Sequence, residues 1–305
     1  MLVRFFRRPH RGMTLIELLV VISILATLSG LLLGGVQKVR SVVASVERQN
    51  WREQHKLGET QRRTQPIKML FIGNSFTYGN DLPGLIQAAA LAGKKTPILV
   101  ETQAYSSHSL ESNWNRPEPL ARIQDPNADW DFVVLQEMRG LPVARTGPDG
   151  YGFLYGRNEY FVPSVKKFDR VIRDRRAITM LYMTWKTPAL AGTVQEDWSD
   201  SHIRLAREIR AECSPVGMAI ERAIRRRPEL ALFADSYPGH LNATGGYLAA
   251  CAFYATIFNE SPVGLPPSLP YASGGVNAVG QANATFLQTC AWDAYLECKK
   301  RLNAP

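Results

Sequence analysis

The chain reads IKMLFIGNSFT from Ile67 to Thr77. Its first seven residues, Ile67–Gly73, are almost continuously apolar, which is typical of a strand buried on both faces of a parallel sheet. A Gly-Asn-Ser turn follows at once and places Ser75 directly after the strand. Ligands bind beyond the carboxyl ends of the strands in open α/β sheets, so Ser75 is the first candidate for a functional side chain.

Outward from this stretch, short apolar runs alternate with amphipathic segments. We expect further strands at Pro97–Gln103, Asp131–Gln136, Ile178–Thr184 and, with a weaker pattern, Leu230–Phe233. Helical patterns occur at Leu82–Ala92, Val165–Arg175, Ser201–Arg210 and Thr244–Phe258. This alternation predicts a mostly parallel sheet, and right-handed crossovers would cover both of its faces with helices. The expected fold class is α/β, a three-layer α/β/α sandwich.

The formal net charge of +9 is concentrated at one end of the 305 residues. Residues 1–68 hold 12 Lys and Arg against 4 Asp and Glu, so the remaining chain is nearly neutral. A nucleic-acid-binding domain would need a basic face on its folded part. We therefore expect no nucleic-acid partner and attribute the basic arm to a segment that flanks a membrane.

The N-terminal arm has the pattern of a membrane anchor. Four arginines and no acid occur in residues 1–12, and the 19 residues from Leu18 to Val36 carry no charge. A helix needs roughly 20 apolar residues to cross the hydrocarbon core. Glu17 stands just inside this run, where a carboxylate is costly and is usually present for a function.

The arm, read as RGMTLIELLVVISILATLSGLL, resembles a type IV prepilin or pseudopilin leader. The resemblance implies that a prepilin peptidase cuts after Gly12 and methylates Met13, and that Glu17 pairs with the terminal amine of a neighbouring subunit. It also implies a single-pass membrane protein with residues 1–12 in the cytoplasm and the folded domain periplasmic or at the cell surface. Secretion or pilus machinery would then be a partner. A plain signal-anchor that happens to contain a glutamate is the alternative.

Composition shifts divide the chain into four parts. We expect a basic leader at 1–12, a transmembrane anchor helix at 13–36, a helical and charged linker at 37–65, and a globular domain at 66–305. The four cysteines, at positions 213, 251, 290 and 298, show no spacing typical of a metal site, so we expect no metal and buried free thiols. A disulfide through Cys213 stays open if the domain is exported.

A histidine late in the chain offers Ser75 a base. The polar loop from Asp235 to Gly246, which contains His240, leads directly into the helical stretch Tyr247–Phe258. A histidine there can reach over the sheet to a serine after the first strand and take its proton. The motif around Ser75 is not the nucleophile elbow G-x-S-x-G, because Thr77 occupies the position of the second glycine.

With these residues, positions 66–305 resemble the SGNH (GDSL-like) hydrolases, in their FIGNSFT branch. The resemblance implies a flavodoxin-like sheet, no cofactor, and ester cleavage through an acyl-enzyme. Carried over block by block, it makes Ser75 the nucleophile and an oxyanion donor, and places Ser107 at the position of a donor glycine. It gives Gln136 the role of the third donor. The last block usually has aspartate three residues before the histidine, but position 237 is Tyr, so Asp235 becomes the candidate that orients His240.

These observations predict a membrane-anchored serine esterase that uses Ser75, His240 and Asp235. By resemblance, the expected substrate is an acylated carbohydrate, above all an O-acetylated one, or another small ester. The competing interpretation is a pseudopilin-like structural or binding protein whose SGNH-like domain has lost catalysis. The substitutions at Ser107 and Tyr237 favour this alternative, whereas a serine hydroxyl close to the imidazole under an open cleft would favour the enzyme.

Overall fold

The computed structural model describes residues 15–54, 65–138, 142, 147–148, 154–155, 158–187, 194–236 and 239–304. Five parallel strands form the central sheet in the order β2-β1-β3-β6-β7. These strands are β1 (Ile67–Gly73), β2 (Ile98–Ala104), β3 (Phe132–Leu135), β6 (Ile178–Tyr182) and β7 (Glu212–Ser214). This is the flavodoxin-like order 2-1-3-4-5, in which the chain reverses direction across the sheet between β1 and β3.

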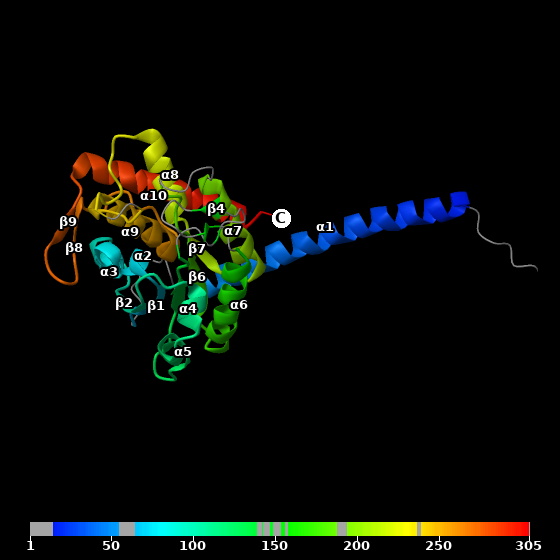
Figure 1. Cartoon of the computed structure of the whole chain (residues 1–305), viewed down its shortest axis with the longest axis horizontal. Coiled ribbons are helices and arrows are strands. Elements are labelled where there is room, and N and C mark those ends of the chain that lie inside the picture. Colours follow the sequence, from blue (N-terminus) through cyan, green and yellow to red (C-terminus); the bar gives the residue numbers. More distant parts are fainter. Residues whose placement is uncertain are drawn as a thin grey trace, which may run out of the picture.

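Helices cover both faces of the sheet, as the alternating pattern predicts. They are α2 (Ser75–Tyr78), α3 (Leu82–Ala92), α4 (Leu110–Trp114), α5 (Pro117–Gln124), α6 (Asn158–Asp174), α7 (Gln195–Glu208), α8 (Val216–Arg226), α9 (Ala243–Phe258) and α10 (Gln281–Leu302). Figure 1 shows α3 and α9 on one side of the strands and α4, α5 and α6 on the other. The three-layer α/β/α arrangement is therefore confirmed.

Short elements complete the described domain. They are the 3₁₀ turn η1 (Gly79–Asp81) and the two-stranded ribbons β4 (Gly147–Pro148) with β5 (Leu154–Tyr155) and β8 (Ser268–Pro270) with β9 (Val276–Ala278). One half of the core lies between the sheet and α9, whose residues from Gly245 to Phe258 are all buried, and the other half lies under α4, α5 and α6. A helix that is apolar all round is expected in such a central position.

One strand was predicted at the wrong place. Leu230–Phe233 forms no strand, and only Phe233 makes an isolated antiparallel bridge, with Leu241. The fifth strand is Glu212–Ser214 instead, paired with β6. It is three residues long and contains Glu212, so it has no apolar run that periodicity could detect.

The N-terminal segment is one continuous helix, α1 (Leu15–Gln54), which leaves the globular part as a long rod in Figure 1. Its stretch Leu15–Leu32 is long and apolar enough to cross a membrane, and none of it is buried against the domain. The expected boundary at position 36 does not interrupt the helix. Residues 55–64 of the expected linker and the processing residues Gly12 and Met13 lie outside the described residues.

Candidate active site

The turn after β1 is built around the side chain of Asn74. Asn74 Oδ1 accepts a hydrogen bond from Phe76 N at 3.0 Å and so caps the short helix α2. Asn74 Nδ2 donates to His108 O at 2.9 Å, which ties the turn to the loop after β2. Asparagine is among the preferred residues for the first of these tasks because its oxygen satisfies an orphaned backbone amide. Ser75 is consequently the first residue of α2.

Gln136, directly after β3, also stabilises this turn through hydrogen bonds. It is fully buried, and its Oε1 accepts from both Asn74 N and Thr77 Oγ1 at 2.9 Å. Its Nε2 donates to Glu137 O. A Cβ atom on Gly73 would lie 2.4 Å from Thr77 Oγ1 and 2.5 Å from Gln136 Oε1, so only glycine fits here. The contacts seen for Gln136 therefore position the Ser75 turn.

The structure brings together the two residues that the sequence proposed as nucleophile and base. Ser75 Oγ lies 2.8 Å from His240 Nε2, although the two residues are 165 positions apart. Both side chains are partly buried at the carboxyl end of the sheet. A hydroxyl at this distance from an imidazole nitrogen can pass its proton to the ring as it attacks an electrophile.

Contacts to the backbone on both sides of His240 fix its position. Trp185 Nε1 donates to Gly239 O at 2.9 Å, and Asn80 Nδ2 donates to Leu241 O at 2.6 Å. The imidazole packs edge-on against Phe76, with ring centroids 5.0 Å apart and an interplanar angle of 84°. Phe76 in turn stacks on Trp185 at 4.7 Å. The histidine loop and the serine turn therefore form one packed unit.

A small cleft of about 20 Å³ opens over this pair. Its walls include Ser75, His240, Trp185, Asn80 and Leu241. A volume of this size is close to that of one or two water molecules. The cleft as it stands can hold a small group such as a short acyl chain.

The loop that carries Ser107 lies against the serine turn. Tyr105 N donates to Gly73 O at 3.1 Å, and His108 O accepts from Asn74. Ser107 has φ = 59°, in the left-handed region that favours glycine. This conformation explains physically why glycine would suit position 107. Among the described residues, neither Ser75 N–H nor Ser107 N–H donates to a protein acceptor, so both amides are available to a ligand.

The Asp235 carboxylate forms no hydrogen bond or ion pair with the His240 ring. Asp235 lies in a bend and is exposed, and its carboxylate makes no hydrogen bond with any described residue. The loop instead closes through its backbone, because Ala234 N donates to His240 O at 2.9 Å. Position 237, where the sequence departs from the SGNH pattern, lies outside the described residues.

A buried carboxyl group underlies the Ser107 loop. Glu137 Oε1 accepts from Leu110 N at 3.0 Å and so holds the first residue of α4. Burial raises the pKa of Glu137 to about 7, because desolvation penalises its charged form. Glu137 Oε2 is buried and has no hydrogen-bond donor among the described residues, and the same holds for Asn113 Oδ1 on α4. Asn113 Nδ2 donates to Gly73 O at 3.1 Å, so this group also reaches the serine turn.

The other candidate residues lie apart from this site. All four cysteines are free and buried, as expected. His202 is buried in α7, where its Nδ1 donates to Trp198 O and its ring packs against Phe161. Glu17 lies on the exposed anchor helix. Within the described residues, no group of three or more His, Cys, Asp or Glu side chains is placed to hold a metal ion.

Sequence reasoning missed the tethers of the site. Asn74, Thr77 and Asn80 all belong to the block FIGNSFTYGND, yet only Ser75 was singled out there. Asn74 had a readable signal, since an asparagine just before a short helix is a typical cap. Asn80 and Trp185 donate to backbone carbonyl groups some 160 and 50 positions away. Every residue has such a carbonyl group, so the sequence does not indicate which one will be the partner.

A comparison with known protein families identifies the N-terminal arm. Residues 7–33 match the family model of the prokaryotic N-terminal methylation motif, which confirms the predicted leader. The comparison with curated protein sequences finds no match. Together with the apolar helix at Leu15–Leu32, the motif indicates that the chain is anchored by a single membrane helix.

Several solved structures are similar to the globular part of this chain. A DUF4886 family protein from Bacteroides uniformis is 19% identical with a TM-score of 0.56, over 76% of this chain and 95% of that chain. A candidate SGNH hydrolase from Slackia heliotrinireducens is 22% identical with a TM-score of 0.48, over 63% and 99%. An acetyl-xylooligosaccharide esterase from Geobacillus, in a mutant form, is 15% identical with a TM-score of 0.47, over 65% and 96%. The first of these likenesses supports the fold alone, and the other two are too loose to carry an argument.

Proposed function

We propose that this protein is a membrane-anchored serine hydrolase that cleaves a carboxylic ester. The observation that carries the proposal is the 2.8 Å distance between Ser75 Oγ and His240 Nε2 at the carboxyl end of β1. In this mechanism His240 takes the proton of Ser75 as the hydroxyl attacks the acyl carbon, and returns it to the leaving alcohol. Water then attacks the acyl-enzyme, again with His240 as base, and releases the acid.

The oxyanion of each tetrahedral intermediate would be held by backbone donors. Ser75 N–H and Ser107 N–H are both available, and the hydrogen bonds from residues 74 and 105 hold their loops together. Gln136, expected as a third donor, is fully buried and does not line the cleft, so it would act by holding the turn. One such donor is worth roughly 3 to 4 kcal/mol of transition-state stabilisation.

The orientation of His240 is assigned here to the loop that carries it. Trp185 and Asn80 hold the carbonyl groups on either side of the ring, and Phe76 packs against its edge. Asp235 would act as an electrostatic partner only if the loop closed further on substrate binding. The expected machinery is therefore a Ser-His dyad supported by packing.

The substrate class proposed is an O-acetylated carbohydrate. The cleft of about 20 Å³ favours a short acyl group over a long one, because a longer chain would need more enclosed apolar volume. With a prepilin-type leader, residues 1–12 would lie in the cytoplasm and the catalytic domain outside it, where polymeric carbohydrates are found. A prepilin peptidase would process the chain at Gly12, and Glu17 would serve in assembly.

The decisive experiment measures hydrolysis of p-nitrophenyl acetate by the detergent-solubilised full chain and its Ser75→Ala variant. We expect the variant to lose at least roughly a thousandfold in kcat, as other serine hydrolases do when the nucleophile is removed. Ser261→Ala, at an exposed serine on a loop after α9, is the matched control and should keep full activity. Equal rates in the wild type and Ser75→Ala would overturn the mechanism and leave the pseudopilin-like structural role as the better interpretation.

A further inference from the structure

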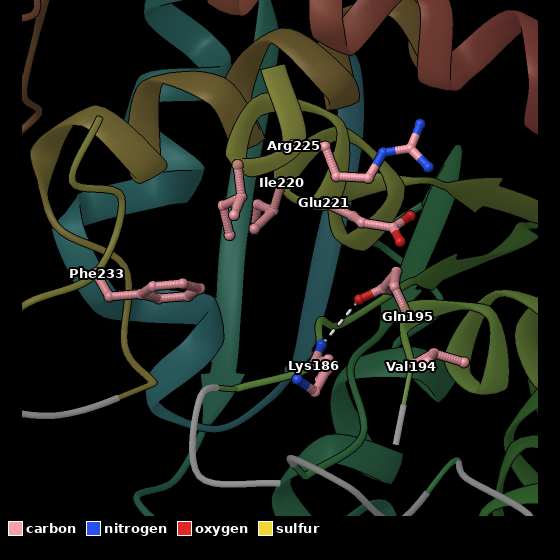
Figure 2. Close-up of a pocket in the computed structure, with 8 residues that line it drawn as sticks. Lys186, Val194, Gln195, Ile220, Glu221, Arg225 and Phe233 are labelled. Carbon is pink, nitrogen blue, oxygen red and sulfur yellow. Dashed lines mark hydrogen bonds between the residues drawn. The ribbon is translucent and has the colours of Figure 1, made fainter. Parts of the chain in front are cut away.

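A second and larger cavity lies beside the candidate active site. Its volume is about 320 Å³, which is within the range of small-molecule sites in proteins. It is formed between the N-terminus of α7, one face of α8 and the segment around Phe233. Figure 2 shows Ile220 and Phe233 pointing into the same space, with Lys186 and Gln195 facing them.

The cavity shares a wall with the catalytic cleft. Trp185 lines the cleft, and the next residue, Lys186, lines the larger cavity. In the same way Leu241 lines the cleft, and its bridge partner Phe233 lines the cavity. The two spaces are therefore lined by neighbouring residues of the same two segments.

The cavity wall is preorganised. Gln195 is buried, its Oε1 accepts from Lys186 N at 2.8 Å, and its Nε2 donates to Thr184 O at 3.2 Å. These bonds fix the start of α7 to the segment after β6. Both groups of the Gln195 amide are thus engaged in holding the wall, which leaves recognition to the remaining lining residues.

Apolar side chains line the space, and cations stand at its edge. Ile220 is buried, Phe233 is half-buried, and Ile224 and Val194 are 36% and 58% exposed. A ligand that covers such apolar surface removes it from water, and this burial favours binding. Lys186 and Arg225 also border the cavity, and within the described residues neither charged group makes a hydrogen bond or ion pair.

One carboxylate, Glu221, also borders the cavity, on the same side of α8 as Arg225, and it lacks an ion pair among the described residues. The described charged residues that border the space, Lys186, Arg225 and Glu221, therefore carry one net positive charge. A neutral apolar ligand would not use this charge, whereas a ligand with a single carboxylate would.

We propose that this cavity binds a small carboxylate with an apolar body, such as an arylacetate, at a site separate from the catalytic cleft. The apolar body packs between Ile220, Ile224 and Phe233, and the carboxylate faces Lys186, with the positive charge of Arg225 at the cavity edge. This site does not depend on Ser75 chemistry, so it stands or falls independently of the proposed function.

The test is ligand-observed fluorine NMR with the detergent-solubilised full chain and 4-(trifluoromethyl)phenylacetate. The matched amide, 4-(trifluoromethyl)phenylacetamide, has the same apolar body without the charge. We expect the carboxylate to bind, and the amide to bind roughly tenfold more weakly, as the loss of one charge-assisted contact predicts. Equal affinity of the two probes, or no binding of the carboxylate at millimolar concentration, would overturn the proposal.

Variants locate the site. Ile224→Asp places a carboxylate on the wall at a partly exposed position, so it should abolish binding of the carboxylate probe without unfolding the chain. Leu296→Asp, at a 46% exposed position on α10, is the control and should bind as the wild type does. Arg225→Glu should weaken binding roughly tenfold. If Ile224→Asp bound the carboxylate probe with the wild-type affinity, while the signal from micelles without protein stayed the same, the ligand would bind elsewhere and the proposed site would be refuted.

Discussion

Ser75 Oγ and His240 Nε2 lie 2.8 Å apart because two separate loops are held rigidly toward each other. Asn74 and Gln136 fix the serine turn, and Asn80 reaches from that turn to the backbone next to the histidine. Since each loop is held by several hydrogen bonds, the distance is set before any substrate arrives. Such preorganisation is what a catalytic pair needs, because geometric errors of about 1 Å can cost roughly a hundredfold in rate.

Trp185→Phe should slow catalysis without weakening substrate binding. The change keeps an aromatic ring for Phe76 to stack on but removes the donor to Gly239 O, so the histidine loop loses one tether. We expect kcat on p-nitrophenyl acetate to fall roughly tenfold with KM little changed. A variant with a lowered Tm and an unaltered kcat would show that the indole only stabilises the fold.

Asp235→Asn should have little effect. Its carboxylate is exposed and makes no hydrogen bond with a described residue, so we expect kcat to change by less than roughly threefold. Removal of a true orienting aspartate costs roughly 10⁴-fold in a triad enzyme. A loss of that size, measured with the same ester, would show that the loop closes on Asp235 in the working enzyme.

Much of this arrangement was predictable from the chain itself, and the reason differs between elements. Ile67–Gly73 and Leu82–Ala92 were located to the residue, because a buried strand and a helix of the outer layer leave strong apolar patterns. Glu212–Ser214 left none, because a three-residue edge strand needs few apolar side chains. Ser75 and His240 were found since each follows or precedes a clearly patterned element. The tethers were not, because contacts to backbone carbonyl groups depend on tertiary structure.

Thr77→Val tests whether Gln136 acts by positioning the serine turn. Valine fills the same space but removes the hydroxyl that donates to Gln136 Oε1, at a cost of about 1 kcal/mol in the free energy of unfolding. We expect kcat to fall roughly threefold, since the glutamine keeps its bond to Asn74 N. Gln136→Leu leaves the backbone amide of Asn74 without its acceptor, so it should lower both the free energy of unfolding and kcat by more than Thr77→Val does. Chemical denaturation and ester kinetics measure the two effects, and an unchanged kcat in Thr77→Val would argue against positioning through this hydroxyl.

Ser107→Gly should stabilise the protein while preserving activity. Ser107 has φ = 59°, which costs a residue with a Cβ about 1 kcal/mol, whereas glycine adopts this conformation freely. Part of the gain is offset by the greater chain entropy of glycine in the unfolded state, so we expect about 0.5 kcal/mol net. Ser107→Ala retains the Cβ and should show no gain. Equal stability of the Gly and Ala variants would mean that strain at this position is negligible.

Glu137 should make the stability of the domain depend on pH near neutrality. Burial raises its pKa in the folded state to about 7, above the ordinary value of 4.5. Between these two values the folded state binds a proton that the unfolded state has released, so the free energy of unfolding falls as pH rises from about 4.5 to 7. The total loss is roughly 3 kcal/mol and is complete above pH 7.

Glu137→Gln removes this dependence and keeps the acceptor for Leu110 N. Denaturation at a series of pH values should therefore give a flatter profile for the variant than for the wild type. At pH 8 the variant should be the more stable of the two, because it buries no charge beneath the Ser107 loop. A charged Glu137 carboxylate would disturb the Ser107 loop, which Leu110 N ties to Glu137 Oε1. Ester kinetics across the same range should therefore show that the wild type loses activity above pH 7 more steeply than the variant. Parallel stability profiles for the two proteins would mean that Glu137 titrates with an ordinary pKa and that its carboxylate is solvated in the folded state.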